Sequence, residues 1–230
     1  MTVTKTKVIL HVPKTGGSSI RWPAMKVDGF RYSCQHCRFD CLPPKYKDMR
    51  KISWVRNPLN WYPSFFFFFK KEYQKIAARK RAMSDPFLDA LLMAGIDSFN
   101  NVLPFLVNLN QFFDNPNLVS NFKKRIRYYQ TNIYACWHSS YWDDIEDLNM
   151  EEYQNKSIYR WYMDTIGIQH CDKVYRLEDE YKSGMLIEFG DNVQFMHKNK
   201  TRNKPENFQL LASQKRMIEI HDEYIFERYY

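Results

Sequence analysis

The chain has no long hydrophobic run. Among its 230 residues, a typical apolar block is Phe65 to Phe69, and the polar residues Ser64 and Lys70 stand on either side of it. A membrane-spanning helix needs about 20 apolar residues in succession, so we expect no membrane span. Only a few residues precede the apolar run Val8 to Leu10, and we therefore expect no signal peptide.

Internal repeats and low-complexity linkers are also missing. A chain of 230 residues can bury a good core as one unit. The hydrophobic content of 44% and the aromatic content of 17% argue against disorder. We therefore expect one domain over residues 1–230.

Acidic residues are in the minority. Lys and Arg number 34 against 26 Asp and Glu, which gives a net charge of +8 and a pI near 9.1. This excess favours anionic partners. No recognised nucleic-acid module is present, and the sequence says nothing about the oligomeric state.

Cysteine is scarce, and its odd count of five agrees with a reducing compartment. Three cysteines follow C-x2-C-x3-C spacing: Cys34, Cys37 and Cys41. Zinc usually takes four ligands in two separated pairs, and no distal C-x-x-C exists, although Cys136, Cys171 or His36 could complete a set. Ordinary thiols are the favoured interpretation, and a metal site or a local disulfide stays open.

Residues 11–20 read His-Val-Pro-Lys-Thr-Gly-Gly-Ser-Ser-Ile and follow the apolar run Val8 to Leu10. A strand, a glycine-containing turn and a helix in this order make an anion cradle, because glycines let backbone N–H groups close around an oxyanion. The helix N-terminus adds positive potential, and Lys14 adds a charge. A Walker A loop has its Lys after the last Gly, whereas Lys14 precedes Gly16 and Gly17. The order argues against an ATP or GTP hydrolase.

A second motif lies at residues 52–64, which read Ile-Ser-Trp-Val-Arg-Asn-Pro-Leu-Asn-Trp-Tyr-Pro-Ser. Ile52 to Val55 is a short apolar strand, and Pro58 suits the first turn of the next helix. An Arg fork such as that of Arg56 suits a terminal phosphate, because it donates two parallel hydrogen bonds.

The two motifs together resemble sulfotransferases that use 3′-phosphoadenosine 5′-phosphosulfate (PAPS), in particular the carbohydrate-type branch. The resemblance implies that Arg56 and Ser64 hold the 3′-phosphate and that no metal is required. It implies that the 5′-phosphosulfate is held by the loop residues Lys14, Thr15, Gly16, Gly17, Ser18 and Ser19. Residues 197–204 resemble the late loop that closes over the nucleotide, which adds Lys200 and Arg202.

The same resemblance implies the chemistry. Lys14 stabilises the leaving nucleotide, 3′,5′-adenosine bisphosphate (PAP), and a His between the two motifs serves as base. His36 is the residue at that place, His138 is the reserve candidate, and His11 is interpreted as structural. The acceptor is a hydroxyl, favoured to be on a sugar. Animal members of this branch carry a membrane anchor, so its absence favours a cytoplasmic enzyme of bacterial or viral type.

Two other functions stay open: an ATP-dependent small-molecule kinase of the P-loop type, and a non-catalytic nucleotide-binding protein of the same fold. The expected fold is α/β, with a parallel sheet flanked by helices. Strands are expected at residues 7–12, 52–55 and 173–176. Helices are expected at residues 17–26, 59–81, 86–94, 98–107, 151–164 and 178–189, with closing helices in 211–230. The aromatic segments 137–142 and 159–162 are interpreted as core.

Overall fold

The computed structural model describes residues 1–33, 39–77, 85–131, 153–195, 205 and 207–230. The chain divides into two compact units. The first unit contains residues 1–57, 162–202 and 226–230, and the second contains residues 58–161 and 203–225. The expectation of one domain over residues 1–230 remains a prediction.

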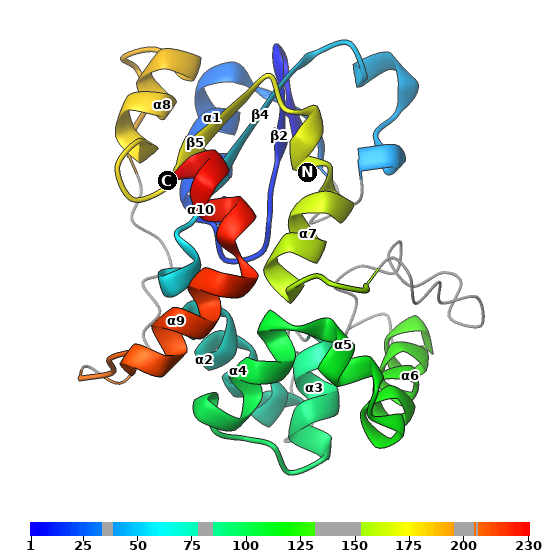
Figure 1. Ribbon diagram of the computed structural model, residues 1–230. Helices are drawn as coiled ribbons and strands as arrows, with labels where there is room; N and C mark the ends of the chain where they lie inside the picture. The colour runs from blue at the N-terminus through cyan, green and yellow to red at the C-terminus, as the bar shows by residue number, and fades with distance from the viewer. Residues whose placement is uncertain (34–38, 78–84, 132–152, 196–204, 206) are drawn as a thin grey trace. The chain divides into compact units, whose positions relative to one another are not determined.

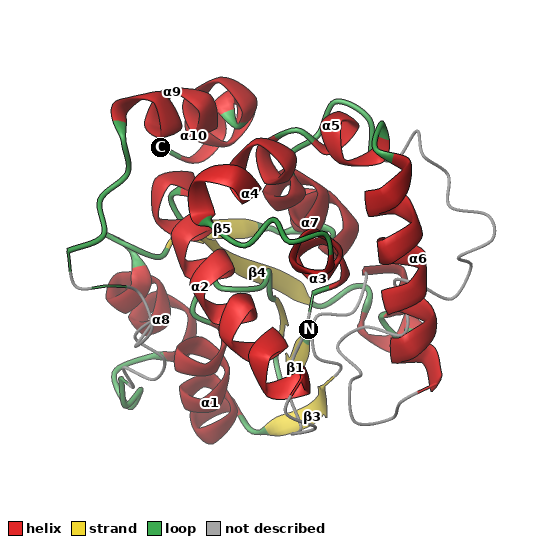
Figure 2. Cartoon of the chain, turned by 90° about the horizontal axis from the view of Figure 1, so that it is seen from below, coloured by secondary structure: helices red, strands yellow, loops and turns green. Residues whose placement is uncertain are grey.

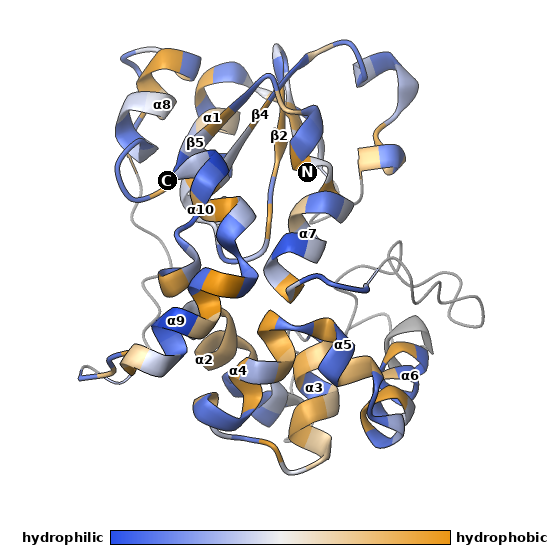
Figure 3. Ribbon diagram, in the orientation of Figure 1, coloured by the Kyte–Doolittle hydropathy of each residue, from blue (hydrophilic) through white to orange (hydrophobic). Residues whose placement is uncertain are grey.

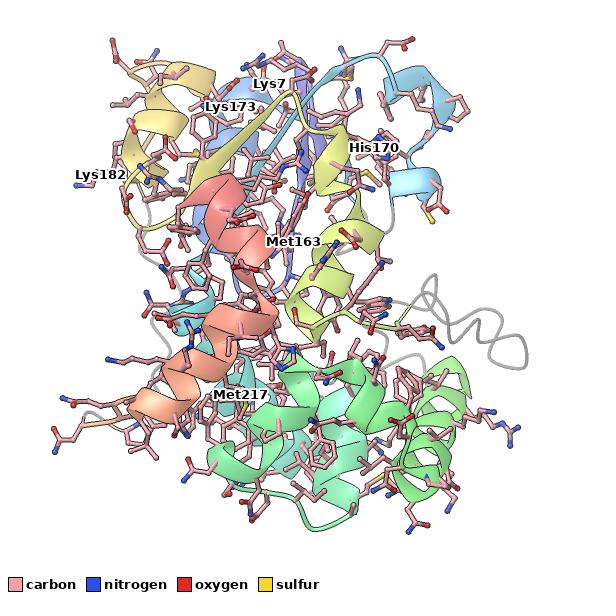
Figure 4. All side chains as sticks on the ribbon, viewed as in Figure 1. Lys7, Met163, His170, Lys173, Lys182 and Met217 are labelled. Carbon is pink, nitrogen blue, oxygen red and sulfur yellow. The ribbon has the colours of Figure 1, made fainter. Side chains whose placement is uncertain are left out.

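The first unit is built on a five-stranded sheet with the order β3-β1-β2-β4-β5. Figure 1 labels three of these strands, β2, β4 and β5. Its strands are β1 (Thr2–Thr4), β2 (Lys7–Leu10), β3 (Phe30–Ser33), β4 (Arg50–Val55) and β5 (Lys173–Arg176). Strands β2, β4 and β5 are parallel, and Figure 4 shows Lys7 and Lys173, the first residues of β2 and β5, at the same end of the sheet.

The expected α/β class is confirmed, and the three expected strands are parallel to one another, but the sheet also contains two strands that were not expected. Strand β1 is antiparallel to both β2 and β3, so the sheet is mixed. Only two residues separate β1 from β2, and such a link permits a hairpin but no parallel crossover. Thr4 closes this turn, since its hydroxyl donates to the Lys7 carbonyl at 3.1 Å and accepts from the Lys7 N–H at 3.2 Å.

Two helices, α1 (Gly17–Asp28) and α8 (Tyr181–Phe189), lie side by side on one face of this sheet (Figure 2). The core beneath them contains Trp54 and Tyr175, whose rings stack with centroids 5.1 Å apart. The Tyr181 hydroxyl donates to the Ser19 carbonyl at 2.9 Å and so ties α8 to α1. The alternate strand residues Val8 and Val55 are also buried, as expected for strands covered on both faces.

The second unit is helical. Helices α2, α3, α4, α5, α6 and α9 lie within it: Pro58–Ala77, Pro86–Met93, Phe99–Val107, Leu109–Phe113, Pro116–Thr131 and Ala212–His221. Helices α7 (Ile158–Ile166) and α10 (Glu223–Tyr229) begin in this unit and end in the first. Apolar residues run along α3 (Figure 3), and the described part of the chain holds no helix that is both long and apolar enough to cross a membrane.

Aromatic side chains form much of the second unit's core. Trp61 stacks on Tyr159 with centroids 4.4 Å apart, and both residues are fully buried. Trp161 is 3% exposed and packs edge-on against Phe87. The interpretation of residues 159–162 as core is therefore confirmed, whereas residues 137–142 lie outside the described residues.

A carboxylic acid is buried in the second unit. Asp222 accepts hydrogen bonds from the hydroxyls of Tyr62, at 2.7 Å, and Ser157. Burial disfavours the charged carboxylate, and it raises the pKa of Asp222 from 3.8 to about 6 even though these two hydrogen bonds and the charge of Arg160 oppose the change. The stability of this unit should therefore depend on pH.

Most of the expected elements are present, and their boundaries differ by a few residues. Strands β1 and β3 and helices α5 and α6 were not expected. Between α5 and α6, the Asn115 side chain accepts from the backbone N–H groups of Asn117 and Leu118 at 3.1 and 3.3 Å.

Candidate anion-binding site

The first motif folds as expected, into a strand, a turn and a helix. Strand β2 ends at Leu10, and α1 begins at Gly17 after a loop of six residues, 11–16. Gly16 precedes the helix in the left-handed conformation, with φ of 80°. A Cβ at Gly16 would lie 2.8 Å from Leu177 Cδ1, so both the backbone angle and the packing favour glycine here.

Lys14 also has a left-handed backbone, with φ of 66°. A residue with a Cβ pays roughly 1–2 kcal/mol for this conformation, so the loop holds Lys14 in a strained geometry. The side chain is partly exposed. Strain of this kind clusters at binding and catalytic sites.

Hydrogen bonds within the loop fix Thr15. Its hydroxyl donates to the Val12 carbonyl at 2.9 Å, and its backbone N–H donates to the same carbonyl at 3.3 Å. Thr15 is 1% exposed. Its side chain therefore supports the loop from within, while Ser18 is partly exposed on the first turn of α1.

His11 packs against the start of α1. A Cβ at Gly17 would lie 2.0 Å from Nε2 of His11, so the imidazole occupies the space that a side chain at position 17 would need. Its Nδ1 lies 3.4 Å from the Thr15 hydroxyl. These contacts agree with the interpretation of His11 as structural.

The second motif comes to the same edge of the sheet. Arg56 directly follows β4, and β4 is parallel to β2, so both motifs begin at carboxyl ends of neighbouring strands. One guanidinium nitrogen of Arg56 donates to the Lys14 carbonyl at 3.3 Å. The structure therefore brings together Lys14 and Arg56, which are 42 residues apart in the chain.

Two residues that sequence reasoning assigned no role fix the turn after β4. One oxygen of the Glu178 carboxylate accepts from the Asn57 N–H at 3.0 Å, and the other accepts from the Tyr230 hydroxyl at 2.8 Å. The Leu177 N–H donates to the Val55 carbonyl at 2.8 Å. Glu178 and Asp179 form an acidic pair just after β5, which was the available signal for Glu178. Nothing in the sequence near Tyr230 indicates that this residue contacts Glu178.

The remaining predicted residues lie in the second unit or outside the residues that the structure describes. Ser64 is buried in α2 and belongs to the second unit. The predicted base His36, its reserve His138, and the late-loop residues Lys200 and Arg202 lie outside the described residues.

The cysteine cluster is described only in part. Cys41 is exposed and forms no disulfide with a described residue, whereas Cys34, Cys37 and Cys136 lie outside the described residues. Cys171 is a free thiol, and burial raises its pKa from 9.0 to about 12. Within the described ranges, no group of three or more His, Cys, Asp or Glu side chains is arranged to hold a metal ion.

Comparisons with protein-family models, with curated proteins and with solved structures find no match to this chain. The chemistry of the site therefore has to be argued from its own residues.

Proposed function

We propose that the protein is a sulfotransferase that moves the sulfuryl group of PAPS to an acceptor hydroxyl. The observation that carries the proposal is the hydrogen bond between the Arg56 guanidinium and the Lys14 carbonyl, 3.3 Å long, at the carboxyl ends of β2 and β4. It joins the two motifs that resemble the phosphosulfate loop and the 3′-phosphate motif of this family.

The electrostatics of the loop suit a ligand with several negative charges. Lys14 and Arg56 supply two cations to the same loop. The first turn of α1 holds no acidic residue of its own, and the positive end of the helix favours an anion. Arg176, which ends β5, is an ion-paired arginine, with Asp179 and Glu180 at 3.2 and 3.3 Å from its guanidinium.

The order of residues supports a phosphosulfate over a nucleoside triphosphate. Lys14 stands before the glycines on a left-handed backbone, and Gly16 directly precedes α1. In a Walker A loop, by contrast, the lysine follows the last glycine and is itself followed by a Ser or Thr whose hydroxyl binds Mg²⁺. Lys14 at the loop tip is suited to the bridging oxygen of a leaving group, because that oxygen gains negative charge as its bond breaks.

The proposed reaction is a single in-line transfer. The acceptor oxygen forms a bond to sulfur while the bond from sulfur to the bridging 5′-phosphate oxygen breaks, and that oxygen leaves with the electron pair. Lys14 stabilises the charge on the leaving oxygen. The acceptor proton passes to a base, for which His36 is the residue predicted from the sequence. The acceptor we propose is a hydroxyl of a carbohydrate.

Calorimetric titration of the whole chain with PAP in the absence of metal, compared with ATP plus Mg²⁺, tests the proposal. We expect micromolar affinity for PAP, and a loss of about tenfold or more in Arg56→Ala, because a charge-assisted pair is worth about 1.5–3 kcal/mol. Arg31→Ala is the matched control, since Arg31 is an exposed arginine of β3, and it should bind PAP as the wild type does.

Other results of this titration would favour a different function or contradict the proposal. Affinity for ATP with Mg²⁺ but not for PAP would favour the P-loop kinase. Binding of neither nucleotide by a folded protein would contradict the proposal. Equal PAP affinity in wild type and Arg56→Ala would show that Arg56 does not hold the 3′-phosphate.

A further inference from the structure

The turn that follows β5 holds the backbone on both sides of Arg56. The Leu177 N–H donates to the Val55 carbonyl at 2.8 Å, just before Arg56 in the chain. The Asn57 N–H, just after Arg56, donates to the Glu178 carboxylate at 3.0 Å. Two consecutive residues of one turn therefore fix the peptide groups that flank this arginine.

The second of these bonds is made by a side chain, at a point between a strand and a helix. Strand β4 ends at Val55, and α2 begins at Pro58, which has no backbone N–H. A proline also disfavours the helical conformation in the residue before it, so Asn57 is not held as a part of α2. The acceptor that the structure places at its N–H is the carboxylate of Glu178.

The carboxylate of Glu178 is itself held. One oxygen accepts from Asn57, and the other accepts from the Tyr230 hydroxyl at 2.8 Å. The two acidic residues that follow it are directed to a different partner, because Asp179 and Glu180 pair with Arg176. Within the acidic run 178–180, it is therefore Glu178 that bonds the turn of Arg56.

The charge of Glu178 has the wrong sign for direct contact with the proposed ligand. A carboxylate and a phosphate repel each other, so its charge alone would weaken the binding of a nucleotide phosphate. Its hydrogen bond to Asn57 acts in the opposite direction, because an arginine that donates two parallel hydrogen bonds has to be held in one orientation. The two effects of Glu178 on affinity therefore differ in sign.

We propose that Glu178 is a positioning residue for recognition of the 3′-phosphate, and that it acts through Arg56. It fixes the Asn57 N–H and thereby the backbone from which the Arg56 side chain projects, while the Tyr230 hydroxyl holds the carboxylate in place. The inference rests on the proposed function, which assigns the 3′-phosphate to Arg56.

Calorimetric titration with PAP and with adenosine 5′-monophosphate (AMP) tests this role, because the two nucleotides differ only in the 3′-phosphate. Glu178→Ala should weaken PAP binding about three- to tenfold, since one hydrogen bond is lost while the charge of Arg56 remains, and should leave AMP binding unchanged. Glu178→Gln should bind PAP nearly as the wild type does, because its amide oxygen can still accept from Asn57. Asp179→Ala is the matched control: it removes the same charge one residue away and should not weaken PAP binding.

A double variant shows whether Glu178 acts through Arg56. Once Arg56→Ala has removed the guanidinium, adding Glu178→Ala should lower PAP affinity no further. A general structural role would instead weaken PAP and AMP alike, and its effect would add to that of Arg56→Ala. Tyr230→Phe provides a second, milder variant, because it removes the hydroxyl that holds Glu178, and it should weaken PAP binding but not AMP binding. Glu178 and Tyr230 are both exposed, so these variants should fold.

The failure of this inference differs from the failure of the proposed function. If Arg56→Ala weakens PAP binding but Glu178→Ala binds PAP as well as the wild type, or more tightly, Glu178 is not a positioning residue and the proposed function stands. Equal losses for PAP and AMP in Glu178→Ala would also overturn the inference. If the folded wild type does not bind PAP, or if Arg56→Ala binds it equally well, the assignment of the 3′-phosphate to Arg56 fails and the role of Glu178 is refuted with it.

Discussion

Replacing Lys14 by Gly should stabilise the protein relative to replacing it by Ala. Lys14 has φ of 66°, and its side chain is lost in both variants, so the comparison isolates the backbone. Both variants keep the carbonyl that accepts from Arg56.

The magnitude follows from two opposing terms. Ala keeps a Cβ in the left-handed conformation, which costs roughly 1–2 kcal/mol. Gly removes this strain, but it loses about 0.5–1 kcal/mol because its unfolded chain has more freedom. The Gly variant should therefore have the larger free energy of unfolding, by about 0.5–1 kcal/mol, or a Tm higher by roughly 1–4 °C at about 2–4 °C per kcal/mol.

Lys26 provides the matched control, because it is an exposed lysine in the last turn of α1. There the helical backbone makes Gly about 1 kcal/mol less stable than Ala. Urea unfolding followed by circular dichroism would give the four free energies. If the Gly variant is less stable than the Ala variant at position 14 as well as at position 26, the backbone of Lys14 is not strained and the reasoning is refuted.

Three further predictions follow from buried groups. Burial raises the pKa of Asp222 to about 6 from 3.8, so the folded state favours the proton: its contribution to stability is complete below about pH 4 and is lost as pH rises through 6. Asp222→Asn should remove a pH dependence of roughly 3 kcal/mol at most, and parallel curves of unfolding free energy against pH for the two proteins would contradict this. Gly17→Ala should lower the free energy of unfolding by about 1–3 kcal/mol, because the new Cβ would lie 2.0 Å from His11 Nε2. The same substitution should cost much less in a His11→Ala background. Equal losses in the two backgrounds would show that the imidazole is not the obstacle. Cys41 is exposed, whereas burial raises the pKa of Cys171 to about 12. Peptide-resolved mass spectrometry after maleimide labelling at pH 8 should therefore find Cys41 modified before Cys171. Equal rates of modification would show that burial does not protect the Cys171 thiol.

The loop could be predicted from the sequence because its chemistry is local. A short apolar strand, a glycine pair and a following helix are written in consecutive residues, and the structure forms them at β2 and α1. Arg56 follows β4 in the same way. Since the carboxyl ends of parallel strands lie at one edge of a sheet, their proximity was also predictable.

Other elements gave weaker signals. The four residues of β3 are mostly exposed, so they lack the apolar alternation that identifies a strand. Helix α6 did carry a usable pattern, because Leu118, Phe122 and Ile126 follow a four-residue spacing and are all buried. Its Asn-rich start obscured this pattern.

Two buried donors, Nε of Arg21 and Nε1 of Trp54, could not be predicted to lack an acceptor, for a different reason. Arg21 lies on α1 and Trp54 on β4, and each residue type is common on such elements. Only the packing of α1 on the sheet shows that Nε of Arg21 and Nε1 of Trp54 are buried without an acceptor among the described residues. Unsatisfied donors are a property of the tertiary structure, and no spacing of residues encodes them.

The discontinuous first unit also sets the order in which the loop is completed during synthesis. Strands β1, β2, β3 and β4 and helix α1 are all encoded before residue 56. The contacts that support the loop from β5 and α8, namely Leu177 against Gly16 and the Tyr181 hydroxyl on the Ser19 carbonyl, come from residues that leave the ribosome much later. No nascent chain that ends before residue 181 can hold the loop with its full set of described contacts, although the loop itself is among the first segments made.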